Sequence, residues 1–303
     1  MTSRLLVGLA LLMLASAVAA APLDPSADGP FEVGVTTMTF VDAARARTLV
    51  TEVWYPATAA GRDAPLHGGR FPLVLAAHGY CGFRTNYEYL TIPLAARGFV
   101  VAAPDFPDFT KSVCDTGTPV ADLVEAPKDL SFLRQVLHDR AGPAAALARR
   151  LRGRRTGVVG HSVGGAAAVT AAIADASLRA VVALAPIAGA PEGETLADLR
   201  PRRAVGVVVG TADPLLALDR AFFGALAPPG FLVTITAGTH SGLTDMDSHL
   251  TPEKLAREEF LARRYAVALL ERYLARNRRF APFLTASDAA AQGPDVVLTA
   301  AGG

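Results

Sequence analysis

The hexapeptide GHSVGG at residues 160–165 decides the fold that this sequence predicts. It follows the apolar run TGVV at 156–159 and precedes the small-residue run AAAVTAA at 166–172. Glycine two residues before and after a serine is typical of a sharp turn from strand to helix, where neighbouring backbone leaves no room for a side chain. The following helix directs its amino end, and the N–H group of Val163, toward negative charge developing at Ser162. We therefore expect Ser162 to be a nucleophile and Val163 to be one oxyanion-hole donor.

Short apolar runs alternate with longer helical patterns along most of the chain. The runs lie at 72–79, 98–105, 156–162, 178–186, 204–213 and 231–238, and the helical patterns lie near 86–97, 122–139, 164–174, 217–227 and 252–275. Strands that are apolar on both faces belong to a mostly parallel sheet covered by helices on both sides. Residues 31–41 and 48–55 flank a polar turn and predict an antiparallel N-terminal edge. The predicted fold class is α/β, with a doubly wound sheet.

The ends of the chain differ in composition from the middle. Arg4, an apolar run from Leu5 to Val18 and three alanines have the order of a secretory signal peptide, so residues 1–21 are expected to be removed. An uncleaved membrane anchor is the alternative, although the run is shorter than the ~20 residues of a spanning helix. Residues 22–276 are expected to form one domain, and residues 277–303, rich in Ala, Gly and Pro, a loosely held C-terminal tail. The mature protein is expected to be secreted or periplasmic, without a stable membrane span.

Charge and cysteine content narrow the classes of partner. The chain has 29 basic and 28 acidic residues, and removal of the signal peptide takes away only Arg4, so 29 minus 1 leaves 28 basic residues against 28 acidic ones. This balance lacks the basic excess typical of proteins that bind nucleic acid or anionic membranes. Two cysteines, Cys81 and Cys114, permit a disulfide in an exported protein. Two partly buried thiols that stay unpaired are the alternative.

A serine nucleophile needs a base, and the chain has six histidines. Four of them are assigned to the surface or to turns: His67, His78, His138 and His161. His240 directly follows the last strand run, from which a side chain can reach over the sheet edge. His249 lies near the start of the final helix, beside residues suited to capping it. We favour His240 as the base.

The acid of such a triad lies between serine and histidine in chain order. Asp213 alone among the acidic residues from 163 to 239 comes directly after a strand run, and Pro214 stiffens its loop. A solvated turn aspartate is the alternative explanation. Asp213 is therefore the expected acid. No His or Cys spacing suits zinc, and no phosphate-cradling glycine loop occurs, so we expect neither a metal nor an organic cofactor.

The segment HGY at 78–80 ends another strand run and is placed to supply the second oxyanion donor. The donor would be the N–H group of Tyr80, with Gly79 allowing close approach. Three aromatic residues are candidates for an apolar wall of a substrate cleft: Tyr80, Phe83 and Phe106. Ordinary packing of these side chains is the alternative.

At these motifs the chain resembles the α/β-hydrolase superfamily, and within it the esterases grouped with dienelactone hydrolase and platelet-activating-factor acetylhydrolase. The resemblance runs from about Gly29 to Tyr273. It rests on VTEVWYPA (50–57), HGYCGFRTNY (78–87), LAARGFVVAAPDFP (94–107), GHSVGG (160–165) and GTHSGLTD (238–245). It implies an α/β-hydrolase domain with Ser162 as nucleophile, His240 as base, and the Tyr80 and Val163 amides as the oxyanion hole.

The chain departs from parts of that group at two positions. In the mammalian acetylhydrolases the acid follows the strand after the nucleophile, whereas VVALAPIAG (181–189) has no carboxylate here. The resemblance then implies Asp213 as the acid, as in dienelactone hydrolases and cutinase-like polyester hydrolases. Dienelactone hydrolases use a cysteine nucleophile, so Ser162 argues against their substrate.

We therefore expect an exported serine carboxylic-ester hydrolase that cleaves short to medium acyl esters through an acyl-enzyme. Its partner would be a small-molecule or polymeric ester and not nucleic acid. A cutinase-like polyester hydrolase is one alternative, because no long insertion suggests a lid over the site. A catalytically dead binding protein on the same fold is the other.

Overall fold

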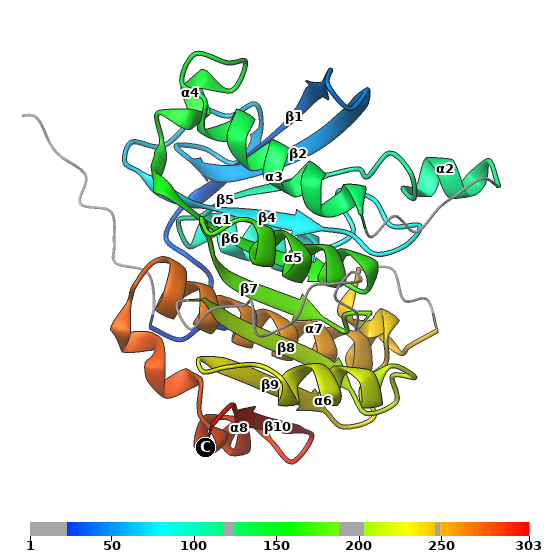
Figure 1. The fold of residues 1–303 in the computed structure, drawn as a ribbon. Coiled ribbons are helices and arrows are strands. Elements are labelled where there is room, and N and C mark those ends of the chain that lie inside the picture. The colour runs from blue at the N-terminus through cyan, green and yellow to red at the C-terminus, as the bar shows by residue number, and fades with distance from the viewer. Residues whose placement is uncertain (1–22, 118–123, 188–202, 246–248, 303) are drawn as a thin grey trace, which may run out of the picture.

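The computed structural model describes residues 23–117, 124–187, 203–245 and 249–302. The predicted signal peptide, residues 1–21, lies outside these ranges. Within them, a single ten-stranded sheet has the order β10-β9-β8-β7-β6-β4-β5-β2-β1-β3 (Figure 1). No helix of the described residues combines the length and apolar character needed to cross a membrane.

The elements alternate along the chain much as the apolar runs predict. The strands are β1 (Glu32–Asp42), β2 (Arg47–Ala57), β3 (Gly61–Arg62), β4 (Phe71–Ala77), β5 (Val100–Pro104), β6 (Leu151–His161), β7 (Leu178–Leu184), β8 (Ala204–Gly210), β9 (Gly230–Ile235) and β10 (Val296–Ala300). The helices are α1 (Glu88–Ala96), α2 (Lys111–Asp115), α3 (Glu125–His138), α4 (Ala145–Ala148), α5 (Val163–Ala174), α6 (Leu216–Gly224), η2 (Ser241–Leu243), α7 (Pro252–Leu269), η3 (Leu270–Leu274), η4 (Arg278–Phe283) and α8 (Ala286–Gln292).

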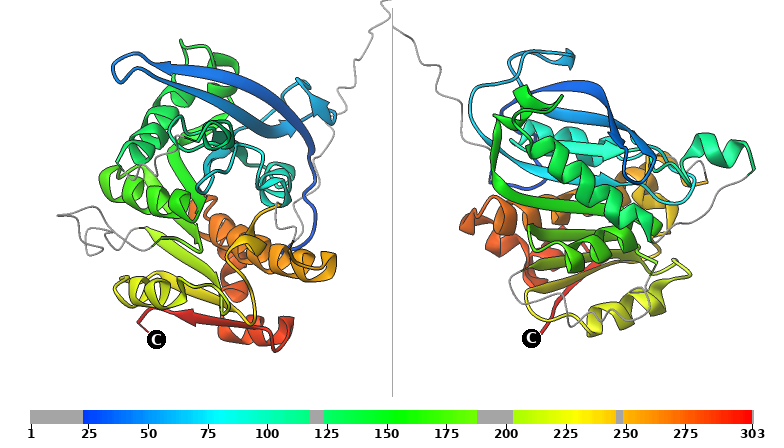
Figure 2. Two further views of the ribbon diagram at one scale, coloured as in Figure 1. Left: turned by 90° about the vertical axis from the view of Figure 1, so that its right-hand side faces the viewer. Right: turned by 45° about the horizontal axis from the view of Figure 1, so that its top comes forward.

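The six central strands, β4 to β9, are parallel and are buried on both faces. Side chains of α3, α5 and α6 join one apolar core. Side chains of α1, α7 and α8 join the second core on the opposite face (Figure 2). The predicted fold class is confirmed: this is an α/β sheet with helices on both sides.

The N-terminal hairpin forms the antiparallel part that the sequence predicts. Strands β1 and β2 pair from Glu32 opposite Ala57 to Asp42 opposite Arg47. Strand β2 in turn pairs antiparallel with β5, so the hairpin extends the parallel sheet. Its side chains add to the core: Leu49 and Val53 are fully buried.

The C-terminal segment differs from the loosely held tail expected for residues 277–303. It forms η4, α8 and β10, and β10 pairs antiparallel with β9, with Val296 opposite Ile235. Val296 and Leu298 alternate with exposed residues and are buried against the second core. The domain boundary predicted at residue 276 is therefore wrong, because this short amphipathic strand covers the edge of β9.

The parallel topology places all carboxyl strand ends at one edge of the sheet. The turns that follow β4, β6, β8 and β9 meet there, at the right-hand side of Figure 1. The amino ends of the same strands, and the end of α7, lie at the opposite edge. Ligands of open parallel sheets bind beyond the carboxyl ends.

Candidate active site

Ser162 occupies the sharp turn between β6 and α5. Its backbone has φ 55° and ψ −121°, a conformation that residues other than glycine rarely adopt. The turn is tight because a Cβ atom on Gly160 would lie 2.2 Å from the carbonyl oxygen of Gly164. A Cβ atom on Gly164 would lie 2.3 Å from the carbonyl oxygen of Ala77. The two glycines therefore permit the turn that presents Ser162 at the sheet edge.

The structure brings the three predicted triad residues into one hydrogen-bonded chain. The Ser162 Oγ atom lies 2.9 Å from His240 Nε2, and His240 Nδ1 lies 2.8 Å from Asp213 Oδ2. Burial raises the pKa of Asp213, but hydrogen bonds from His240 and from the Leu215 amide outweigh it and hold this pKa below its usual value. An ionised Asp213 only accepts hydrogen bonds, so it fixes the proton of His240 on Nδ1. The Nε2 atom is then free to accept the hydroxyl proton of Ser162.

Two neighbouring loops hold Asp213 and His240 next to each other. Asp213 follows β8 in a turn in which the Leu215 amide donates to Asp213 Oδ1 at 2.8 Å. The Ala212 amide donates to the carbonyl of Gly238 at 2.9 Å, which ties this loop to the one that carries His240. The side chain of Asp213 is inaccessible to solvent, whereas that of His240 is 30% exposed. The base thus faces the surface where a substrate would arrive.

Helix α7 contributes a carboxylate that anchors the His240 loop. Glu258 is buried, and its Oε2 atom accepts a hydrogen bond from the Thr239 amide at 2.9 Å. Gly242 leaves room for this carboxylate, because a Cβ atom there would lie 2.1 Å from Glu258 Oε2. The residue before the base is therefore held by a charge-assisted hydrogen bond.

A second chain of hydrogen bonds connects the base loop with the loop after β4. His161 Nε2 lies 2.8 Å from the carbonyl oxygen of His240, so this nitrogen donates and carries the ring proton. His161 Nδ1 then accepts from the Tyr87 hydroxyl at 3.1 Å, and that hydroxyl accepts from the Gly79 amide at 3.1 Å. Burial, together with the neighbouring His240, lowers the pKa of His161 to about 3, which keeps His161 neutral.

The loop after β4 lies directly against the nucleophile. A Cβ atom on Gly79 would lie 3.2 Å from the Cβ atom of Ser162, so the peptide between Gly79 and Tyr80 passes beside the serine. Cys81 forms a disulfide with Cys114, and its amide donates to the carbonyl of Phe109 at 2.9 Å. This loop is thus fixed to the segment that contains α2.

The aromatic candidates separate into surface and core. Tyr80 is 47% exposed and Phe83 is partly exposed, so both are accessible beside the site. Phe106 is fully buried and stacks on Phe109, with ring centroids 5.1 Å apart. The prediction that Phe106 lines a substrate cleft is therefore wrong, because its ring packs in the core against His78 and Phe109.

A family model described as PETase, PET hydrolase-like, matches residues 17–199, which is more than half of the chain. The chain belongs to the PET hydrolase-like family. This PET hydrolase-like chain also superposes on a solved ferulic acid esterase from Streptomyces cinnamoneus with a TM-score of 0.72. The identity is 24%, and the match covers 93% of this chain and 100% of the other, so the likeness shows the α/β-hydrolase fold.

Membership of the PET hydrolase-like family confirms the α/β-hydrolase resemblance and makes the chain an ester hydrolase. The narrower resemblance to dienelactone hydrolase and platelet-activating-factor acetylhydrolase stays a prediction. Among the described residues, no group of three or more His, Cys, Asp or Glu side chains is arranged to hold a metal ion.

Sequence reasoning missed the residues that position the triad. Tyr87 lies in the quoted HGYCGFRTNY motif, but nothing in that motif shows that its hydroxyl reaches His161. Glu258 lies in an ordinary amphipathic helix, and its contact with Thr239 depends on how α7 packs. The signal that identified Ser162, Asp213 and His240 was their place after strand runs, which these two residues lack.

Proposed function

We propose that this PET hydrolase-like chain is an exported serine carboxylic-ester hydrolase that acts on short to medium acyl esters. The observation that carries the proposal is the hydrogen-bonded chain from Ser162 through His240 to Asp213. Family membership supports ester hydrolysis, and the apolar run from Leu5 to Val18 supports export.

In the proposed reaction, His240 Nε2 takes the hydroxyl proton as Ser162 Oγ attacks the ester carbonyl carbon. The imidazolium formed on His240 is stabilised by Asp213 and then protonates the leaving alcohol as the acyl–oxygen bond breaks. Water attacks the resulting acyl-enzyme with His240 again as base, which releases the acid and restores Ser162.

The negative charge of each tetrahedral intermediate needs donors that are already in place. The Val163 amide begins α5 directly after the nucleophile, and the Tyr80 amide belongs to the loop that passes beside Ser162. We assign these two N–H groups to the oxyanion hole. The disulfide at Cys81 supports this role because it restrains the residue that follows Tyr80.

A burst assay with p-nitrophenyl esters from acetate to palmitate tests the proposal. Wild type should release a burst of about one equivalent of p-nitrophenol where deacylation is slow, and Ser162→Ala should abolish it. Ser131→Ala, which changes a serine on α3 in a pocket that does not include Ser162 or His240, is the matched control and should keep the burst. Absence of hydrolysis with every ester would support the dead binding protein, although the 2.9 Å contact between Ser162 and His240 argues against it.

A polyester substrate is the second candidate, and the PET hydrolase-like family model favours it. A cleft open to a polymer chain would have exposed aromatic contacts, and Tyr80 is 47% exposed. Incubation with amorphous polyester film distinguishes the two candidates by the soluble products released. Activity on short esters without release from film would leave the small-ester hydrolase as the function.

A further inference from the structure

The sheet edge opposite the active site is lined with arginine. It contains the amino ends of the parallel strands and the ends of α3 and α7, at the left-hand side of Figure 1. Six arginines from four segments of the chain gather there. We define the arginine face as Arg70, Arg140, Arg152, Arg155, Arg276 and Arg279. Arg155 is partly exposed and the other five are exposed.

These residues form one continuous surface. A hollow of about 650 Å³ is lined by Arg70 and Arg140, and a second hollow of about 310 Å³ is lined by Arg70, Arg152 and Arg279. The two hollows adjoin because both include Arg70. Arg155 and Arg276 complete the face: burial lowers the pKa of Arg155, and the positive charge of Arg276 lowers it further.

The charge of the arginine face is not neutralised within the described part of the chain. None of its six residues makes an ion pair with a carboxylate there. Two acidic residues line the hollows: Asp139, which accepts a hydrogen bond from the Ala141 amide at 2.9 Å, and Glu271, which pairs with Arg97 at 3.6 Å. The balanced net charge of the sequence therefore conceals a strongly basic edge.

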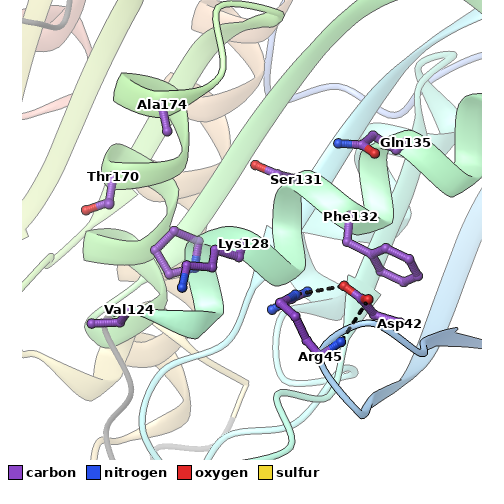
Figure 3. A pocket seen from close by; sticks show the side chains of 10 residues that line it. Asp42, Arg45, Val124, Lys128, Ser131, Phe132, Gln135, Thr170 and Ala174 are labelled. Carbon is purple, nitrogen blue, oxygen red and sulfur yellow. Dashed lines mark hydrogen bonds and ion pairs between the residues drawn. The ribbon is translucent and has the colours of Figure 1, made fainter.

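A pocket elsewhere on the molecule provides a comparison. It has a volume of about 540 Å³ and lies beside α3 and α5 (Figure 3). Its cations are compensated: Arg45 pairs with Asp42 at 2.7 Å, and Lys128 pairs with Glu125 at 2.6 Å. Basic residues outside the arginine face can therefore serve as controls.

We propose that the arginine face docks on a membrane surface rich in anionic phospholipid. A guanidinium group can donate two hydrogen bonds to the oxygens of one phosphate group. The electrostatic attractions of several basic residues near an anionic surface also add up. The first described residues lie at the same edge, because Arg97 Nη1 donates to the carbonyls of Asp24 and Ala27. This inference rests on the proposed export and is independent of the esterase reaction.

Docking in this orientation leaves the catalytic edge facing away from the lipid. Ser162 and His240 lie at the carboxyl ends of the strands, and the arginine face lies at the amino ends. A docked enzyme would meet esters that arrive from the surrounding medium. The lipid itself would stay outside the reach of Ser162.

Vesicle sedimentation tests the proposal. The full chain is expressed, the form that accumulates is purified, and it is mixed with vesicles of equal parts phosphatidylglycerol and phosphatidylcholine or of phosphatidylcholine alone. We expect binding to the anionic vesicles at about 20 mM salt and its loss at about 500 mM, where the screening length is only a few ångströms. Binding to phosphatidylcholine vesicles as strong as to the anionic vesicles would overturn the proposal, because the binding would then depend on apolar contacts and not on charge.

Two charge-reversal variants locate the binding surface. Arg152→Glu/Arg279→Glu should lower the partition coefficient by about 100-fold, since each reversal removes an attraction and adds a repulsion. Arg220→Glu/Lys128→Glu makes the same change in net charge outside the arginine face and should lower it by less than about tenfold. Equal losses in both variants, or no binding of wild type to anionic vesicles, would overturn the proposal. Both variants should keep wild-type hydrolysis of soluble p-nitrophenyl acetate, so a failed esterase assay and a failed docking assay are distinguishable.

Discussion

The Tyr87 hydroxyl joins the loop that carries the oxyanion donor to the loop that carries the base. Tyr87→Phe would leave the Gly79 amide and His161 Nδ1 without their partner, and unpaired buried groups of this kind cost about 1–3 kcal/mol each. We expect kcat for a p-nitrophenyl ester to decrease about tenfold while KM changes little, because the defect lies in the alignment of catalytic groups.

Tyr89→Phe is the matched control for Tyr87→Phe. The Tyr89 hydroxyl donates a hydrogen bond to the carbonyl of Leu243, and it contacts neither Gly79 nor His161 in the described contacts. The Tyr89→Phe variant should therefore melt at a lower temperature than wild type but keep the wild-type kcat. If both variants lose kcat in proportion to stability, Tyr87 has only a structural role.

Asp219 is a buried carboxyl group, and neither of its oxygens has a hydrogen-bond partner among the described residues. Burial, together with the nearby negative charge of Asp213, raises its pKa to about 7. In the unfolded chain the group ionises near 3.8, so between about pH 4 and pH 7 the folded protein binds a proton that the unfolded chain has lost. Asp219 therefore reduces the free energy of unfolding as pH rises through this window.

Asp219→Asn removes this penalty. We expect its melting temperature at pH 8 to exceed that of wild type by on the order of 5 °C, and the difference to shrink toward pH 4. Glu32→Gln, which replaces an exposed carboxyl on β1, should show no such pH-dependent difference. A shift that is the same at pH 4 and pH 8 would contradict the assignment of a protonated buried carboxyl.

At this scale, the sequence predicted the residues whose position follows from strand order. Ser162, Asp213 and His240 each come directly after an apolar run, so a parallel sheet alone brings them to one edge. Phe106 also follows a run, yet its ring turns into the core, because side-chain direction depends on packing that no run reveals. Tyr87 and Asp219 lie on or beside helices, and their contacts required the three-dimensional arrangement.

At the scale of elements, β10 is held in the sheet by its pairing with β9, a strand that is distant in sequence. A chain ending at Gly293 would lose the burial of Val296 and Leu298 and would expose the edge of β9. Burial of two such side chains contributes about 3–6 kcal/mol, so the melting temperature should decrease by about 10 °C or more.

A chain ending at Ala301 is the control for the truncation. It keeps β10 and its pairing with β9, and it should melt close to wild type. Light scattering during the thermal scan should also rise earlier for the chain ending at Gly293, because an unpaired strand edge promotes association. Equal melting curves for the two truncations would show that β10 adds no stability.

The strand and helix patterns of the middle of the chain were predictable, whereas those of the end were not. The predicted helical pattern 164–174 and the observed helix α5 differ by one residue, because the turn at Ser162 fixes where α5 begins. Strand β10 has only five residues and follows an alanine-rich stretch with Gly293 and Pro294, a composition that is typical of loops. Its pairing partner, β9, lies far away along the chain.

At the scale of the whole molecule, the disulfide restrains the unfolded chain. Cys81 and Cys114 are 33 residues apart, and closing such a loop contributes about 3–4 kcal/mol in the chain-entropy model. Cys81→Ser/Cys114→Ser should therefore melt about 10 °C below wild type. Reductant should lower the melting temperature of wild type and leave that of the double variant unchanged. A reductant effect on the double variant would show that the loss has another origin.

The two glycines of the sharp turn at Ser162 affect how a mutational scan of this protein is interpreted. Gly160 and Gly164 contribute no reactive atom, yet a Cβ atom there would lie only 2.2 and 2.3 Å from backbone carbonyl oxygens, far inside van der Waals contact. In a library scored by enzyme activity they should tolerate as few substitutions as Ser162. A library scored by the amount of folded protein should separate them: alanine at position 162 accumulates normally, whereas alanine at 160 or 164 is depleted. If only the activity library were scored, the two glycines would be mistaken for residues that take part in the reaction, although their role is to permit the turn.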